Sequence, residues 1–219
     1  GGGRLENKMS VALFGGTFDP VHNGHLRIAS ELAELLPVNE LRMMPCGFPP
    51  HRDDTEVSAH QRLEMLELGI GVNNSILSVE DIELQRPAPS YSIDTVTFMR
   101  EKLGSSTPLF LCVGMDALAT INTWRHWKEL LSFCHIAVSS RPGFSAPKQG
   151  PLCEWIAQHE SDNLNEIKKC PSGYIYFCDL TMLAISSTTI RDKIKQGSSI
   201  RYMTPEPVVN YIQQHRLYE

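Results

Sequence analysis

Short apolar runs alternate with segments of helical spacing along the first third of the chain. A strand is expected at about 10–14, and the next segment repeats apolar residues at intervals of three and four, which predicts a helix: Leu26, Ala29, Leu32, Ala33 and Leu36. Pro37 cannot continue that helix. A second strand is expected at 40–44. Ser58 and Gln61 then have the spacing of a capping box, which predicts a helix that runs to Ile70.

The same alternation continues to the C-terminus. Residues 109–113 are continuously apolar, which is typical of a central parallel strand covered on both faces. Further strands are expected at 76–79, 134–138 and 174–178. Helices are expected before Gly104, around Trp124 and Trp127, at 155–159, before Gly197 and after Pro205. This alternation predicts an α/β fold, a Rossmann-like, doubly wound, mostly parallel sheet with helices on both faces.

The polar stretch that stands out is GGTFDPVHNGH at residues 15–25, which we call the histidine turn. It lies at the end of the first strand and the start of the first helix. Glycine lets another molecule approach the backbone, and the free N–H groups and dipole of a helix N-terminus favour an anion. His22 and His25 can add side-chain donors to the same anion. The histidine turn therefore predicts a phosphate site.

Other polar groups also follow predicted strands. They are Gly114, Asp116, Arg141 and the Ser/Thr-rich helix start at 185–192. In open α/β sheets the ligand lies beyond the carboxyl ends of the strands, so these groups are expected to share one site. The sequence has neither GxGxxG after the first strand nor GxxxxGK[ST], which disfavours a dehydrogenase and a P-loop kinase.

The remaining combination suits displacement at a nucleotide phosphate, a reaction in which the protein positions two anions and stabilises charge. His22 and His25 would donate to the phosphates, and Arg191 would pair with them as a planar fork. Hydroxyl donors would come from Thr17 and from Ser186 or Ser187. The reaction needs no protein nucleophile.

Several of these residues have a second interpretation. His22, His25 and Asp19 could instead hold zinc, although the rest of the ligand set is not identifiable. Asp116 could cap the following helix rather than contact a ribose hydroxyl. Trp127 is expected in the core. Ser186 or Ser187 could be a helix cap and a phosphate donor at once. Arg52 and Arg141 could be surface charges or ligand contacts.

Composition narrows the class of protein. A net charge of −5 disfavours a broad nucleic-acid surface but allows a small anionic ligand. The six cysteines form no CxxC pair, so buried, reduced thiols at Cys112, Cys134 and Cys178 and a cytoplasmic location are expected. No apolar run reaches membrane-spanning length, and no signal peptide is apparent. Residues 9–219 are expected to form one domain, and residues 1–8 to be an expression-tag remnant.

At this point the sequence resembles a known family. The histidine turn is similar to the HxGH signature of the nucleotidyltransferase superfamily, and ISSTTIR at 185–191 is similar to its second signature. The intervening motifs resemble those of the bacterial nicotinate-nucleotide adenylyltransferases: PPHR at 49–52, SYSIDT at 90–95, GMDAL at 114–118, TW at 123–124 and RPG at 141–143. The resemblance runs from about residue 9 to the C-terminus, and residues 144–173 contribute nothing to it.

The resemblance implies transfer of the adenylyl group of ATP to nicotinate mononucleotide, with Mg²⁺, giving deamido-NAD and pyrophosphate. It implies catalytic roles for His22, His25 and Arg191. The ATP side would be lined by Gly15, Gly16, Thr17, Phe18, His22, His25, Gly114, Asp116, Arg141, Ser186, Ser187 and Arg191. The mononucleotide side would be lined by His51, Tyr91, Ser92, Trp124 and Arg125.

Within the mononucleotide side, the resemblance implies that Trp124 stacks on the pyridine ring. Backbone N–H groups near Ser92 and Arg125 would receive the carboxylate of the ring. The alternatives are another phosphate acceptor, such as phosphopantetheine, and a non-catalytic nucleotide-binding module. The preference for nicotinate over nicotinamide and the oligomeric state stay open.

Overall fold

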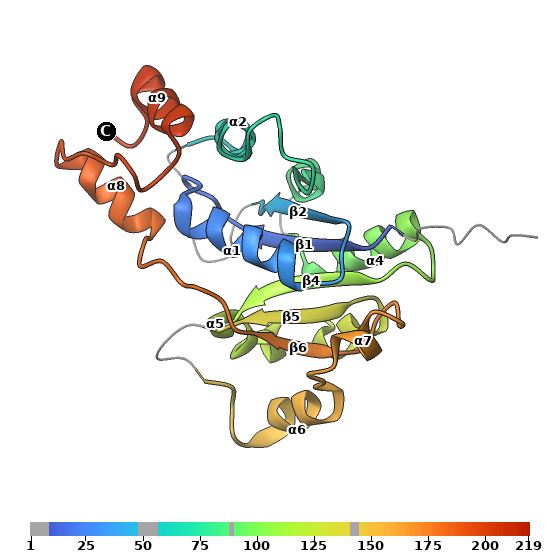
Figure 1. The fold of residues 1–219 in the computed structure, drawn as a ribbon. Coiled ribbons are helices and arrows are strands. Elements are labelled where there is room, and N and C mark those ends of the chain that lie inside the picture. Colours follow the sequence, from blue (N-terminus) through green and yellow to red (C-terminus); the bar gives the residue numbers. More distant parts are fainter. Residues whose placement is uncertain (1–8, 48–56, 88–89, 141–144) are drawn as a thin grey trace, which may run out of the picture.

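A six-stranded parallel sheet forms the centre of the computed structural model, which describes residues 9–47, 57–87, 90–140 and 145–219. The strand order is β3-β2-β1-β4-β5-β6 (Figure 1). The strands are β1 (Val11–Gly16), β2 (Glu40–Pro45), β3 (Leu77–Val79), β4 (Leu109–Gly114), β5 (His135–Ser139) and β6 (Ile175–Cys178). This sheet confirms the predicted Rossmann-like α/β class, with every strand pair parallel.

The order of the strands fixes where a ligand can bind. The chain builds β1, β2 and β3 outward to one edge and then returns to the other side of β1 for β4, β5 and β6. β1 and β4 are direct neighbours, with Phe14 opposite Cys112. Because the strand order reverses at this pair, a crevice forms beyond their carboxyl ends. Gly16 and Gly114 end the two strands at that crevice.

The helices follow the sequence pattern closely. They are α1 (Asn23–Leu35), α2 (Ala59–Ile70), α3 (Ile82–Gln85), α4 (Ser92–Leu103), α5 (Met115–Leu118), α6 (Gly150–His159), α7 (Leu164–Ile167), α8 (Ser187–Lys195) and α9 (Glu206–His215). The predicted capping box of α2 is confirmed: Gln61 N donates to Ser58 Oγ at 3.1 Å, and Ser58 N donates to Gln61 Oε1 at 3.2 Å. Gly104 and Gly197 follow α4 and α8 with φ of 88° and 71°, as expected for helix ends.

The region of the first two tryptophans differs from the prediction. The expected helix is two short 3₁₀ segments, η1 (Ile121–Thr123) and η2 (Trp127–Ser132). Trp124 lies between them in an extended conformation, and His126 has a left-handed φ of 52°. The two tryptophans therefore do not share one helical face. The helix predicted at 155–159 begins earlier, at Gly150, and the short helices α3 and α7 were not predicted.

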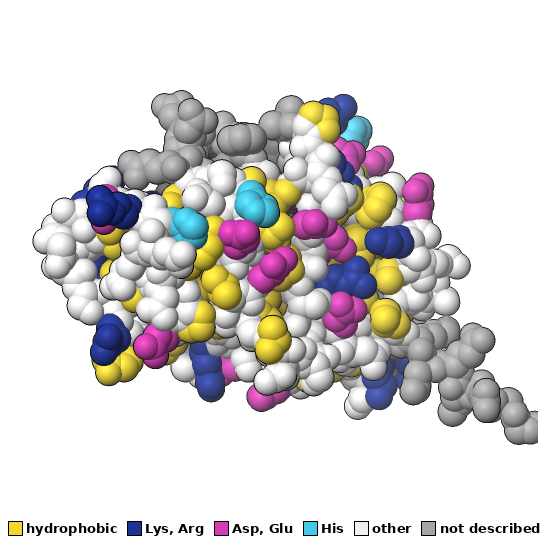
Figure 2. Space-filling model, turned by 90° about the horizontal axis from the view of Figure 1, so that it is seen from above, with side chains coloured by type: hydrophobic (Ala, Val, Ile, Leu, Met, Phe, Trp, Pro, Cys, Tyr) yellow, Lys and Arg dark blue, Asp and Glu magenta, His cyan; other side chains and the backbone are white. Residues whose placement is uncertain are grey.

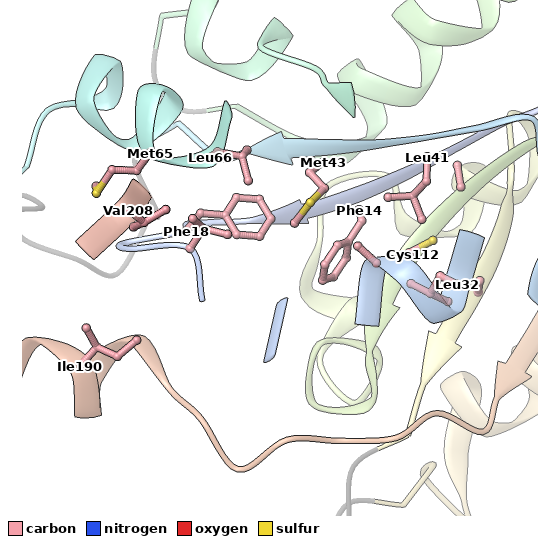
Figure 3. Packing of buried hydrophobic residues seen from close by; sticks show 14 of the residues in the cluster. Phe14, Phe18, Leu32, Leu41, Met43, Met65, Leu66, Cys112, Ile190 and Val208 are labelled. Carbon is pink, nitrogen blue, oxygen red and sulfur yellow. The ribbon is translucent and has the colours of Figure 1, made fainter. Parts of the chain in front are cut away.

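Both faces of the sheet are buried, which explains the continuously apolar strands. Along β1, Ala12 and Phe14 belong to one hydrophobic cluster, whereas Val11 and Leu13 belong to the other. The first cluster includes residues of α1, α2, α8 and α9, and Figure 3 shows its side chains between β1 and these helices. The second includes residues of α4, η2 and α6. Helices on both faces confirm the doubly wound arrangement.

The cysteines of this chain are reduced, and three of them lie in the core. All six cysteines are free thiols, and Cys112, Cys134 and Cys178 are buried, as predicted. Burial raises the pKa of Cys134 and Cys178 to about 12.

On the face seen in Figure 2, basic and acidic side chains are mixed, and neither sign forms a separate patch. Within the described residues, every helix is too short or too polar to span a membrane.

Candidate active site

His22 and His25 form a reciprocal cap at the first turn of α1. His22 precedes the helix in an extended conformation, and its Nδ1 accepts from Gly24 N at 3.0 Å and from His25 N at 3.3 Å. In return, His25 Nδ1 accepts from His22 N at 3.2 Å. The two rings stack with their centroids 3.6 Å apart. The local sequence therefore builds a capping box in which both side chains are imidazoles.

This geometry determines the protonation of the two rings. A ring nitrogen that accepts from a backbone N–H carries no proton, so each neutral imidazole has its proton on Nε2. Burial lowers the pKa of His22 to about 4. Burial, with the neighbouring His22, lowers the pKa of His25 to about 3. Near pH 7 the free protein therefore presents two neutral Nε2–H donors from stacked rings, a spacing that suits neighbouring oxygens of a phosphate chain.

Gly24 makes room for this arrangement. A Cβ at this position would lie 2.8 Å from His22 Cε1 and 2.9 Å from His22 Nδ1. Real Cβ atoms do not approach a ring so closely, so a larger residue would push the His22 ring away from the helix N-terminus. The absence of a Cβ at Gly24 thus leaves room for the His22 ring, and it also lets a ligand approach the backbone.

Phe18, which follows Gly16 by two residues, turns its ring toward the core. Phe18 has a left-handed φ of 50°, and its side chain is 1% exposed, in the same core cluster as Leu66 and Val208 (Figure 3). Its ring lies edge-on to His25, with centroids 4.9 Å apart. A Cβ on Gly16 would lie 2.9 Å from that ring. The side chain of Phe18 therefore supports His25 from the core. Its role on the ATP side stays a prediction.

The second signature lies against the histidine turn. Arg191, in α8, donates from Nη1 to Asp19 O at 2.7 Å and from Nη2 to Thr188 Oγ1 at 3.2 Å. Ser187 Oγ donates to Pro20 O at 2.9 Å. The structure thus brings His22, His25, Ser187 and Arg191 into one region although the two motifs are far apart in the sequence, at 15–25 and 185–191. In the free protein Ser187 and Arg191 bind the backbone of the turn, and the guanidinium retains further N–H donors for an anion.

The other predicted ATP-side residues surround this region. Ser186 caps α8, since Thr189 N donates to its Oγ at 3.1 Å. Asp116 is exposed in the first turn of α5 and makes no side-chain cap hydrogen bond, so the capping alternative is not observed. A Cβ on Gly114 would lie 2.6 Å from Asp116 Oδ1, so glycine lets this carboxylate lie against the strand end. Gly15 and Thr17 are half-buried at the end of β1.

The predicted acceptor residues form a second group at the N-terminus of α4. The Arg125 guanidinium lies over the Tyr91 ring, 5.1 Å from its centroid. Tyr91 and Trp124 both pack against the second core cluster, and Trp124 stays half-buried. Ser92 begins α4, which has no side-chain cap hydrogen bond. Beside it, the buried Ser90 Oγ has no hydrogen-bond partner within the described part of the chain.

Two predicted residues, His51 and Arg141, lie outside the described residues, as does Arg52.

The zinc alternative conflicts with the geometry of the histidine turn. Both Nδ1 atoms already accept backbone N–H bonds, and the Asp19 carboxylate accepts from Tyr218. Over the described ranges, no three His, Cys, Asp or Glu side chains are grouped so that they could hold a metal ion.

A cavity of about 620 Å³ lies between α8 and α9. Its wall includes Asn23, the residue after His22, together with Arg201, Tyr202 and Gln213. His22, His25 and Trp124 do not line this cavity. This cavity is therefore separate from the predicted nucleotide site.

Sequence reasoning missed several groups that hold the histidine turn. Arg62 Nη1 donates to Thr17 O at 2.7 Å and to Cys46 O at 3.0 Å. Thr204 Oγ1 donates to Val21 O at 2.8 Å, and Tyr218 hydrogen-bonds to Asp19. Arg62 lies in α2, and Thr204 and Tyr218 lie after α8, in residues 196–219, which we call the C-terminal segment. All three are outside any phosphate-binding motif, so no local signal marks them.

The chain is similar over nearly its whole length to known proteins. Residues 13–193 match the cytidylyltransferase-like family. A protein of Pectobacterium atrosepticum named "Probable nicotinate-nucleotide adenylyltransferase" is 39% identical over 210 residues, which cover 95% of this chain and 98% of that protein. A protein of the same name from Pseudomonas fluorescens is 45% identical over 210 residues, covering 95% and 96%.

Solved structures agree on the fold. The nicotinic acid mononucleotide adenylyltransferase of Plasmodium falciparum, complexed with NaAD, matches with a TM-score of 0.70 at 19% identity, covering 96% of this chain and 97% of that one. Its complex with APC matches with a TM-score of 0.65 at 18% identity. From the family match and the full-length relatives, the chain belongs to the nicotinate-nucleotide adenylyltransferases of the cytidylyltransferase-like family.

Proposed function

We propose that this chain transfers the adenylyl group of ATP to nicotinate mononucleotide and forms deamido-NAD and pyrophosphate. The observation that carries the proposal is the pair of neutral, stacked imidazoles of His22 and His25 at a helix N-terminus, at the point where the strand order reverses. The names of the full-length relatives support the same reaction.

In the proposed reaction a phosphate oxygen of the mononucleotide attacks the α-phosphorus of ATP in line. One O–P bond forms, the bond from the α-phosphorus to the bridging oxygen breaks, and pyrophosphate leaves with that electron pair. Phosphate oxygens are already deprotonated, so no protein base is required. Nε2–H donors of His22 and His25 stabilise the charge that develops on the transferring and leaving groups.

Arg191 has two functions in this proposal. Its Nη1 orders the histidine turn through Asp19 O, and its remaining N–H groups face the phosphates. Asp116, in the first turn of α5 directly after β4, is expected to contact the ribose hydroxyls. The ATP-side roles of Arg141, Ser186 and Ser187 stay predictions.

Three features support an acidic pyridine nucleotide as the acceptor. The N-terminus of α4 has no side-chain cap hydrogen bond, so its first N–H groups are available to a carboxylate. The buried hydroxyl of Ser90 offers another donor beside it. The half-buried ring of Trp124 is suited to stacking on a flat heterocycle.

Magnesium is expected to arrive with ATP rather than to occupy a protein cage. The described residues offer no cluster of three ligating side chains, and Mg²⁺ in nucleotide sites is held mainly by phosphates and water. The residues fit that mode, because the histidine turn supplies donors for phosphates and no competing carboxylate cluster. When bound, the ion would neutralise part of the phosphate charge.

A cytoplasmic location is also part of the proposal. It is supported by the six free thiols, since reduced cysteines are typical of that compartment.

The test is pyrophosphate release by purified protein with ATP, Mg²⁺ and nicotinate mononucleotide. We expect release well above that of a His22→Ala, His25→Ala double variant. No release above this control would refute the proposal. Nicotinamide mononucleotide and phosphopantetheine in the same assay separate the acceptors. Nucleotide binding without turnover of any acceptor would identify a non-catalytic module.

A further inference from the structure

The C-terminal segment forms several hydrogen bonds with the histidine turn. Val21 O accepts from Thr204 Oγ1 at 2.8 Å. Asn23 N donates to Met203 O at 2.8 Å, and Asn23 Nδ2 donates to Tyr202 O at 2.9 Å. These bonds extend those that Ser187 and Arg191 make to the turn. The first turn of α1 is thus fixed from outside by residues about 180 positions later in the chain.

Tyr218, which follows α9, makes a further buried contact with the histidine turn. Its hydroxyl donates to Asp19 Oδ1 at 2.5 Å, and the two residues are 3% and 2% exposed. Burial and the Asp19 carboxylate raise the pKa of Tyr218, so the phenol keeps its proton and stays a donor. Arg191 binds the backbone carbonyl of the same aspartate.

The backbone after α9 directs this ring inward. Arg216 and Tyr218 both have left-handed conformations, with φ of 50° and 67°. Residues other than glycine rarely adopt this region, and they keep it where surrounding contacts over-determine it. Here those contacts include the neighbouring Leu217, which is also buried, and the buried bond to Asp19.

We propose that Tyr218 is a positioning residue for adenylyl transfer, acting through Asp19 to hold His22 and His25 in their stacked, Nε2–H form. The inference rests on the proposed function for its kinetic consequence. Tyr218 hydrogen-bonds neither histidine, so it acts only through the backbone of the turn. Asp19 precedes His22 by three residues, and a displaced Asp19 alters the angle at which the chain enters α1.

The kinetic test compares Tyr218→Phe with Tyr211→Phe. Tyr211 lies in α9 and also donates to a carboxylate, that of Glu64 in α2, but it forms no hydrogen bond with the described residues of the histidine turn. The two variants therefore lose the same chemical group and the same kind of bond. We expect kcat of Tyr218→Phe to fall about 10- to 100-fold, with KM for both substrates changed less than about twofold. Tyr211→Phe is expected to keep the wild-type kcat.

A spectroscopic test needs no turnover. The ¹⁵N shifts of the His22 and His25 ring nitrogens at pH 7 are expected to show the Nε2–H tautomer in the wild type and in Tyr211→Phe, and a mixture of tautomers in Tyr218→Phe. Altered tautomers without any adenylyl transfer by the wild type would support the inference while refuting the proposed function.

A second variant guards against failure of Tyr218→Phe to fold. Thr204→Val removes the donor to Val21 O from the same segment, and we expect the same fall in kcat and the same tautomer mixture. Wild-type kcat and unchanged ring shifts in the variants that fold would overturn the inference. An equal fall in Tyr211→Phe would also overturn it, because the effect would then not depend on the histidine turn.

Discussion

Replacing Gly24 by alanine tests the link between the histidine turn and catalysis. The added Cβ would lie 2.8 Å from His22 Cε1, too close for any carbon contact, while the next neighbour, Ile185 O, is at an ordinary 3.6 Å. The helix backbone fixes the Cβ, so the ring of His22 has to move. Its Nδ1 then loses the bonds from Gly24 N and His25 N.

The stability change of Gly24→Ala is expected to be small. Loss of an N-cap side-chain bond costs about 0.5–2 kcal/mol. Alanine in place of glycine within a helix contributes about 1 kcal/mol in the opposite direction. The two effects nearly cancel, so the unfolding free energy is expected to change by no more than about 1 kcal/mol. The variant therefore stays folded at 25 °C.

Activity is expected to respond much more strongly. Displacement of one preorganised donor to a developing anion costs about 10²- to 10³-fold in kcat. Pyrophosphate release at saturating ATP and nicotinate mononucleotide measures this effect, and urea unfolding measures stability on the same samples. Ser30→Ala is the matched control, because it raises helix propensity on the exposed side of α1. Gly24→Ala with the kcat of Ser30→Ala would refute the reasoning.

Three further predictions concern the same site. Gly16→Ala places a Cβ 2.9 Å from the packed Phe18 ring and should lower the unfolding free energy by about 1–3 kcal/mol, measured by urea denaturation. His22 and His25, with pKa values of about 4 and 3, are neutral in the folded protein and charge near pH 6.5 when unfolded. Stability should therefore fall as pH drops below about 6.5, by up to about 1.4 kcal/mol per pH unit for each histidine, and His25→Gln should fall less steeply. Trp124→Ala should raise KM for nicotinate mononucleotide about tenfold, measured against an unchanged KM for ATP.

Each of these expectations has a contrary outcome. Gly16→Ala with wild-type stability would mean that the Phe18 ring moves freely. Equal slopes of stability against pH in wild type and His25→Gln would mean that His25 is not held neutral. Equal increases in KM for ATP and the mononucleotide in Trp124→Ala would show a general disturbance rather than an acceptor contact.

The sequence predicted the elements of the fold because their signals are local. The strand and helix around the histidine turn follow from apolar spacing, and the start of α2 follows from Ser58 and Gln61. The prediction of a helix around Trp124 and Trp127 was wrong for a physical reason. Apolar spacing of three is shared by α-helices and 3₁₀ turns, and it does not reveal that Trp124 is extended or that His126 is left-handed.

Residue roles within the histidine turn were less predictable. The order of motifs indicated that His22 and Arg191 meet, but not that Arg191 binds the backbone of Asp19. An aromatic residue in a glycine turn can face either a ligand or the core. Only the packing of α2 and α9 against β1 decides that Phe18 faces the core.

The neutral state of the histidines is a property of the whole fold rather than of the HxGH spacing. The spacing allows each Nδ1 to accept a backbone N–H, which sets the tautomer. Both rings are kept uncharged by burial, to which distant parts of the fold contribute. Phe18 packs edge-on against His25, and Thr204 holds the backbone of the turn at Val21. A donor that is already neutral and already oriented loses little when it meets phosphate charge, because no solvent or proton has to rearrange first. Distant residues such as Tyr218 can therefore change the rate without contacting either substrate.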